Sequence, residues 1–167
     1  LHKEYRRQRQ MCIRDSEWMS NSVGFRYGKE FTNPNNPHYI SKRIYSFTHA
    51  SGYQYGSNYL HLDVLLSDND DPRKGTNKGS SEVYGVYRHQ LYSSRVLDTP
   101  LGTGLIKDYA LTMGFDASRN NNLGSAKKRA LVFGPTLKFN TVGVLDLSLL
   151  YYLSLIHISE PTRQAEI

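Results

Sequence analysis

The chain has 167 residues, of which 21 are Lys or Arg and 15 are Asp or Glu, and its formal net charge is +6. A single cysteine, Cys12, excludes a disulfide framework. No apolar run approaches the roughly 20 residues of a membrane-spanning helix, so this sequence contains no candidate for one.

The basic residues are concentrated at the start, in RRQRQMCIRDS at residues 6–16. A nucleic-acid arm or a transit peptide fits this stretch poorly, because acidic residues interrupt the charge and no apolar run follows. Back-translation explains it better: ATG TGT ATA AGA GAC AG encodes Met11 to Ser16 and is the end of an adapter used for DNA sequencing libraries. The last fifteen residues, LSLIHISEPTRQAEI, read as the opposite adapter in the same way.

We therefore expect residues 1–16 and 153–167 to be adapter-derived and only residues 17–152 to be native. The two ends carry six of the 21 basic and four of the 15 acidic residues, which leaves a charge of +4 for the central segment. That segment has no cysteine, and its four histidines are not spaced as metal ligands. We expect no metal, no cofactor, no catalytic residues and no nucleic-acid polymer as partner.

Within this segment the apolar residues recur at every second position, which predicts strands. The clearest runs are at 58–68, 107–116, 128–139 and 144–152, and less regular strands are expected near 19–27, 40–50 and 81–92, seven in all. In the first run one face carries Leu60, Leu62, Val64 and Leu66, whereas His61 and Asp63 lie on the other.

The connections between these strands favour one architecture. Long polar stretches at 28–38, 68–81 and 117–127 alternate with tight turns at 51–56 and 140–143, although the connection at 93–104 breaks the rule. Long loops at one end and short turns at the other are typical of an outer-membrane β-barrel, whose strands alternate apolar-out and polar-in. A soluble antiparallel barrel or sandwich would show the same alternation with its apolar face inward.

Two observations favour the membrane barrel over the soluble one. The polar face carries ionic groups well within the strands, as a wet lumen would, and aromatic residues lie near strand ends, as in an interfacial girdle. The girdle candidates are Phe25, Tyr27, Tyr45, Phe115, Phe139 and Tyr151. The fold expected for residues 17–152 is an all-β, antiparallel transmembrane β-barrel fragment.

A resemblance supports this interpretation. Phe47, Thr48, His49, Gly52, Tyr53, Tyr55, Gly56 and Asn58 match a turn pattern, Ser67 and Asp68 end the next strand, and Glu82, Tyr84, Tyr87 and Arg88 match a further strand. In these residues the chain resembles the nucleoside-specific channel family of Gram-negative outer membranes, the Tsx-like and outer-envelope proteins. The resemblance implies a barrel of roughly twelve strands, of which this chain would hold about seven.

The resemblance also implies a function, facilitated diffusion of small polar solutes, with nucleosides as substrates and outer-membrane lipid as surroundings. Aromatic rings would stack on the base, and carboxylates and amides would bind the ribose. The candidate lumen residues are His61, Asp63, Glu82, Tyr84, Arg88 and Asp108. A non-transporting surface barrel, such as a phage receptor or adhesin, and a soluble lipocalin-like binder stay open as alternatives.

Overall fold

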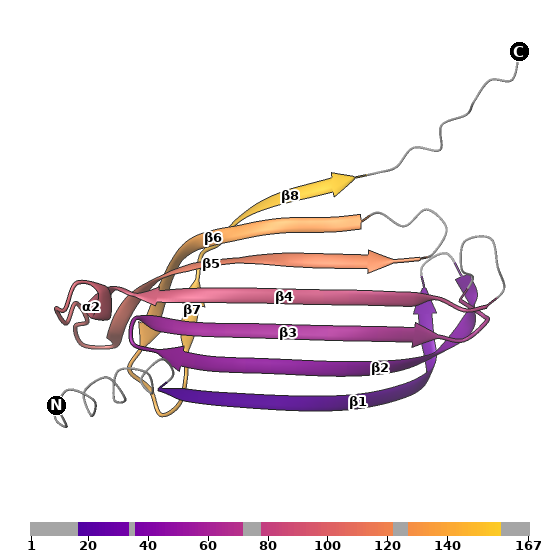
Figure 1. Cartoon of the computed structure of the whole chain (residues 1–167), viewed down its shortest axis with the longest axis horizontal. Coiled ribbons are helices and arrows are strands. Elements are labelled where there is room, and N and C mark those ends of the chain that lie inside the picture. Colours follow the sequence, from indigo (N-terminus) through magenta and orange to yellow (C-terminus); the bar gives the residue numbers. More distant parts are fainter. Residues whose placement is uncertain (1–16, 34–35, 72–77, 122–126, 158–167) are drawn as a thin grey trace, which may run out of the picture.

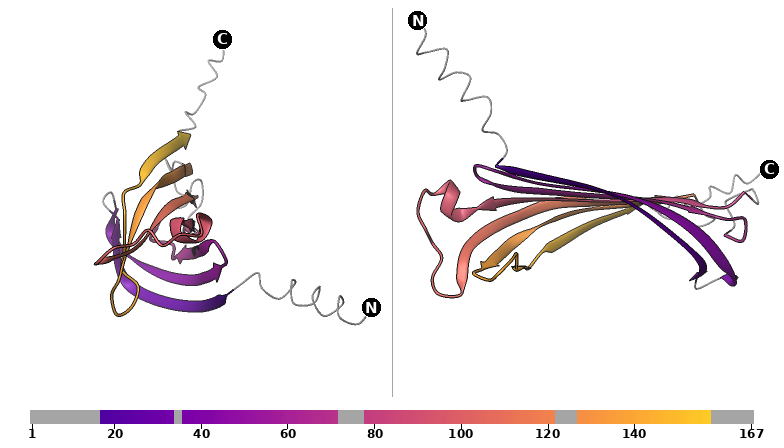
Figure 2. Two further views of the ribbon diagram at one scale, coloured as in Figure 1. Left: turned by 90° about the vertical axis from the view of Figure 1, so that its left-hand side faces the viewer. Right: turned by 90° about the horizontal axis from the view of Figure 1, so that it is seen from below.

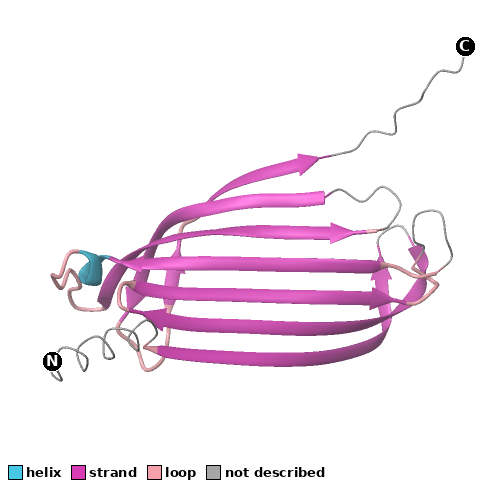
Figure 3. Ribbon diagram, in the orientation of Figure 1, coloured by secondary structure: helices cyan, strands magenta, loops and turns pink. Residues whose placement is uncertain are grey.

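The computed structural model describes residues 17–33, 36–71, 78–121 and 127–157. These residues form strands almost throughout, with one short helix in the connection between β4 and β5 (Figures 1 and 3). The elements are β1 (Trp18–Asn33), β2 (Asn36–Tyr53), β3 (Gly56–Ser67), β4 (Ser81–Tyr92), α2 (Ser93–Val96), β5 (Ile106–Asn120), β6 (Lys127–Phe139), β7 (Asp146–Ser148) and β8 (Tyr151–His157).

The strands form one antiparallel sheet in which each strand pairs with its neighbours in the chain, and β8 pairs with β6 beside β7. Seen end-on the strands follow an arc (Figure 2). Within the described residues the sheet is open, with β1 at one edge and β7 and β8 at the other. The predicted all-β antiparallel fold is confirmed. None of the helices in this part of the chain is long and apolar enough to cross a membrane.

The last two strands are one strand position interrupted in the middle. Leu137 faces Leu147 across the β6–β7 ladder, and four residues along Phe133 faces Tyr151 across the β6–β8 ladder, so the register is unchanged. Pro135 lies between the two ladders and accepts a bond from the Leu149 amide, but it has no N–H to return. The sheet therefore has the seven strand positions that the sequence predicts.

The ladder between β6 and β8 continues in the same register through residues 153–157. This stretch belongs to the C-terminal segment expected to be adapter-derived, and its apolar start extends the last strand. Residues 1–16 and 158–167 lie outside the described residues. The adapter origin of both ends stays a prediction, which the sequence of the source gene tests.

The first hairpin differs from the sequence prediction, which placed a loop at residues 28–38. In the structure β1 extends to Asn33 and β2 begins at Asn36, with two register irregularities around Phe31. Phe31 pairs with Ile40, which is fully buried, and the Lys42 ammonium lies 5.8 Å from the centre of the Phe31 ring. Strand pairing depends on backbone hydrogen bonds, which do not require alternating apolar residues. The side-chain contacts of Phe31 add to this pairing in a stretch where the sequence shows no alternation.

The more buried face of the sheet carries small or polar side chains, and the more exposed face carries large apolar ones. On β5 and β6 the buried positions alternate with exposed ones. The buried side chains are small or polar, including Ala110, Thr112, Ala130 and Thr136. The exposed ones on the same strands are large and apolar, namely Tyr109, Leu111, Met113, Phe115, Leu131 and Phe133. Soluble proteins usually place such residues the other way round.

Strand pairing extends this division over the whole sheet. Phe47 faces Leu62, which faces Gly85, and Leu60 faces Tyr87, which faces Phe115, so the apolar positions of neighbouring strands share one face. We call this the outer face, and the opposite, more buried one the inner face. The predicted alternation of Leu60, Leu62, Val64 and Leu66 against His61 and Asp63 is confirmed.

A close approach of two strands requires glycine at position 114. A Cβ added to Gly114 would lie 2.0 Å from the Tyr87 carbonyl oxygen, whereas one added to Gly24 would meet nothing closer than Ser46 Cβ at 3.5 Å. We expect Gly114→Ala to lower the free energy of unfolding by about 1–3 kcal/mol, because the neighbouring backbone must move. Urea titration of the folded protein measures this. Gly24→Ala is the matched control, and an equal loss in both variants would contradict the explanation.

Candidate functional site

All six predicted site residues project from the inner face. Asp63 faces Tyr84, and Asp108 faces Lys138, across their ladders. The rest follow from the same registers: Glu82 faces Leu65, Arg88 faces Tyr59 and His61 faces Val86. The sequence therefore placed these residues on one face correctly, but the face spans two separate groups of side chains.

The first group lies in the middle of β1, β2 and β3. Arg26 Nη2 lies 3.1 Å from Asp63 Oδ2 and donates a hydrogen bond to Ser46 Oγ at 2.9 Å. On the other side His61 Nε2 is 3.2 Å from Asp63 Oδ1, and Thr48 Oγ1 is 2.8 Å from His61 Nδ1. Asp63 thus holds Arg26 and His61 in place.

The Asp63 carboxylate offers little to a solute. Its Oδ1 atom is buried and makes no hydrogen bond of good geometry within the described residues, and Oδ2 is engaged by Arg26. The Arg26 side chain, by contrast, is 60 % exposed. The guanidinium that Asp63 orients is therefore the more accessible group, and the sequence analysis did not select it.

Arg88 is fixed against the next strand. Its Nη1 lies 2.6 Å from Asp116 Oδ1 and also donates to the carbonyls of Tyr87 at 2.9 Å and Phe115 at 3.3 Å. Arg88 therefore pairs with Asp116 on β5 and not with Glu82 on its own strand.

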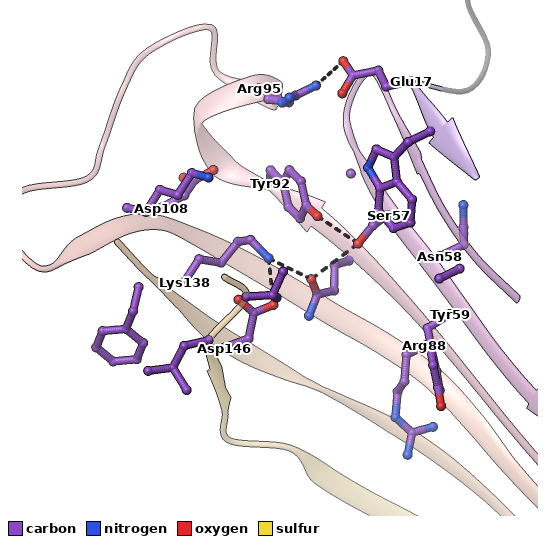
Figure 4. A pocket seen from close by; sticks show the side chains of 18 of the residues that line it. Glu17, Ser57, Asn58, Tyr59, Arg88, Tyr92, Arg95, Asp108, Lys138 and Asp146 are labelled. Carbon is purple, nitrogen blue, oxygen red and sulfur yellow. Dashed lines mark hydrogen bonds and ion pairs between the residues drawn. The ribbon is translucent and has the colours of Figure 1, made fainter. Parts of the chain in front are cut away.

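The second group surrounds a pocket of about 590 Å³ at the end of the sheet where α2 lies (Figure 4). Strands from both halves of the sheet contribute to it, together with the connections at residues 93–105 and 140–145. Its side chains include Glu17, Trp18, Ser57, Tyr59, Arg88, Gln90, Tyr92, Arg95, Asp108, Lys138, Phe139 and Asp146.

Lys138 organises the polar side of this pocket. Its Nζ lies 2.7 Å from Asp146 Oδ2, donates to Gln90 Oε1 at 3.3 Å and lies 4.6 Å from the centre of the Tyr92 ring. The Tyr92 hydroxyl in turn donates to Ser57 Oγ at 2.9 Å (Figure 4). Because the ammonium is paired with a carboxylate, this side of the pocket presents hydrogen-bonding groups without a large net charge.

Asp108 anchors the connection that borders the pocket. The buried carboxylate accepts hydrogen bonds from Ser94 Oγ at 2.6 Å, from the Ser94 amide at 3.2 Å and from the Tyr109 amide at 2.8 Å. Arg95 adds a second tie, because it pairs with Glu17 and donates to the Gln54 carbonyl at 3.2 Å. The hydrogen bond to Glu17 raises the pKa of Arg95 above its ordinary value.

We expect Asp108→Ala to loosen the connection at residues 93–105. Hydrogen bonds to a charged group contribute about 1.5–3 kcal/mol each, and the alanine leaves the Ser94 and Tyr109 amides without this acceptor. Amide hydrogen exchange of residues 93–105 should become faster while exchange in β3 stays unchanged. Exchange that accelerates equally in both regions would indicate global destabilisation and contradict the local role.

The six predicted residues therefore do not form one site. Arg88 and Asp108 line the pocket, whereas His61, Asp63, Glu82 and Tyr84 lie further along the sheet. The sequence analysis missed the pocket residues Trp18, Tyr59, Tyr92 and Lys138. Phe139, which the sequence analysis placed in an aromatic girdle, also lines the pocket, and the girdle itself stays a prediction. The alternation of the sequence did place Lys138 and Asp146 on the polar faces of their strands. It could not show that these two strands and the ends of β1, β3 and β4 would together form one pocket.

Comparisons of the chain with protein-family models, with curated proteins and with solved structures found no match. Among the described residues no group of three or more His, Cys, Asp or Glu side chains is arranged to hold a metal ion. The geometry of the sheet is therefore the structural basis for proposing a function.

Proposed function

We propose that the chain forms part of the wall of a β-barrel channel in a bacterial outer membrane. The observation that carries the proposal is the inverted polarity of the sheet, with large apolar side chains on the exposed outer face and small, polar or paired ionic ones on the inner face. Exposed apolar patches of this extent mark membrane or protein contacts. A lipid-facing barrel wall has this same alternation.

The strand lengths support the same conclusion. β3 and β4 have 12 residues each and β6 has 13, whereas a tilted strand needs about 9–11 residues to cross the hydrocarbon core. An open edge exposes unpaired backbone groups that lipid cannot satisfy, so the functional form is a closed barrel completed by further strands.

The pocket on the inner face favours a small, largely neutral solute. It combines aromatic rings from Trp18, Tyr59 and Tyr92 with the paired Lys138 and Asp146, which suits a flat ring carrying hydroxyl groups. The resemblance to the nucleoside-specific channel family points to nucleosides. Passage is by facilitated diffusion: binding is strong enough to favour entry and weak enough to allow release, and no chemical step is involved.

Liposome swelling with the complete gene product tests the channel. We expect nucleosides to enter the liposomes faster than sugars of similar size, and planar bilayers to show discrete conductance steps. A protein that inserts but leaves the bilayer impermeable would instead be a surface barrel that acts through its loops. Recovery of the complete protein in the soluble periplasmic fraction would overturn the membrane assignment.

A further inference from the structure

A groove of about 650 Å³ crosses the outer face between β3 and β6. It exists because Gly85 on β4 faces Ala117 on β5, so two adjacent strands lack large side chains at this level. Leu62 and Phe115 form its apolar sides. The groove lies toward the end of the sheet where β5 ends and β6 begins, opposite to α2 (Figure 1).

Arginines border this groove. Arg119 and Arg129 both line it together with Lys127 and Lys128, and all four side chains are exposed. Arg129 faces Ala117 in the ladder, and Arg119 faces Val83, which places both guanidinium groups on the outer face. They lie in the last residues of β5 and the first of β6, at the margin of the apolar surface.

On the strands that border the groove, no carboxylate shares the outer face with these arginines. Every carboxylate on β3 to β6 projects from the inner face, namely Asp63, Glu82, Asp108 and Asp116. The ion pairs formed among the described residues use other cations, and neither Arg119 nor Arg129 takes part in them. An apolar groove with a cationic margin complements an anion attached to an apolar chain.

We propose that this groove binds an anionic membrane lipid, with an acyl chain over Gly85 and Ala117 and the lipid phosphate between Arg119 and Arg129. The inference rests on the proposed membrane location. At the depth of the headgroups a guanidinium binds phosphate oxygens through paired, charge-assisted hydrogen bonds. Each basic residue near an anionic surface adds about 1 kcal/mol, or roughly a fivefold preference.

Local tryptophan quenching by brominated lipids measures lipid preference at one position. Trp18 is the only tryptophan, so Trp18→Phe gives a silent background in which Phe115→Trp reports on the groove. Phe25→Trp is the control reporter, because Phe25 lies on the outer face of β1, away from the strands that line the groove. Both reporters are placed in the complete gene product, in which any tryptophan of the further strands is also replaced by Phe. The protein is reconstituted in mixed phosphatidylcholine and phosphatidylglycerol vesicles, with one lipid brominated at a time.

We expect the Phe115→Trp reporter to prefer brominated phosphatidylglycerol by about 30-fold, and the Phe25→Trp reporter to show no preference. Arg119→Gln combined with Arg129→Gln should remove most of the preference, leaving only the contribution of Lys127, and Lys29→Gln on β1 should leave it unchanged. Ala117→Leu, which fills the groove without changing charge, should also reduce it.

Equal quenching by the two lipids at both reporters would overturn the lipid site and leave the membrane assignment intact. A preference at Phe115→Trp that is undiminished by the double Arg→Gln substitution would also overturn it. If neither brominated lipid quenches either reporter, the outer face does not contact lipid, and the proposed function fails together with this inference.

Discussion

Leu62→Arg will impair the assembly of the protein in membranes. Leu62 lies in the middle of β3 on the outer face, between Phe47 and Gly85 of the neighbouring strands. A charged side chain near the bilayer midplane on the lipid side of a barrel costs about 2–4 kcal/mol. The free energy of unfolding, measured by urea titration of the complete protein in lipid vesicles, should decrease by this amount.

His61→Arg is the matched control, because it places the same guanidinium one residue away on the inner face. There it meets Asp63, which already lies 3.2 Å from His61, and assembly should be normal. If Leu62→Arg assembles normally while His61→Arg does not, the faces are assigned the wrong way round. The apolar face would then be the interior of a soluble barrel.

The alternation of the strands was predictable because it is a local property. Side chains of a strand point to opposite faces at every residue, so the faces of β3, β5 and β6 follow from the sequence alone. The number of strand positions also followed, since polar stretches separate the apolar runs. Which face is buried did not follow, because a soluble and a membrane barrel share the same pattern.

The limits of the strands depended on contacts that no local pattern contains. Strand pairing around Phe31 and Ile40 continues through a stretch whose composition predicts a loop. The interruption after β7 results from Pro135, a residue on a different strand that cannot donate to the ladder. Both features are consequences of register, which brings together residues far apart in the chain.

For the candidate site, too, the face of each residue followed from the local sequence, whereas its contacts with distant residues did not. The sequence selected inner-face residues correctly, but it did not show that Arg26 would pair with Asp63 across two strands or that Lys138 would reach Gln90. The pocket is assembled by the α2 connection, which Asp108 holds through Ser94. A carboxylate that looks like a ligand-binding group in a strand pattern can therefore serve to position the chain.

Tyr59→Ala will weaken nucleoside binding about tenfold. Tyr59 is 42 % exposed on the inner face and lines the pocket beside Arg88 (Figure 4). Stacking of a base on an aromatic side chain contributes about 1–3 kcal/mol, and a loss of 1.4 kcal/mol corresponds to a factor of ten. Titration of adenosine against the ion conductance of the complete protein in planar bilayers gives the half-saturating concentration, which should rise in this variant.

Two further variants separate stacking from other effects of the change. Tyr59→Phe keeps the ring and should retain the affinity, since only the hydroxyl is lost. Tyr45→Ala removes a ring of nearly equal exposure, 46 %, from the outer face, and each inserted channel should bind adenosine as before. An equal rise for Tyr59→Ala and Tyr45→Ala would mean that the ring at position 59 does not contact the base. The nucleoside assignment would then lose its aromatic support, because stacking is what distinguishes a nucleoside from other small polar solutes in this pocket.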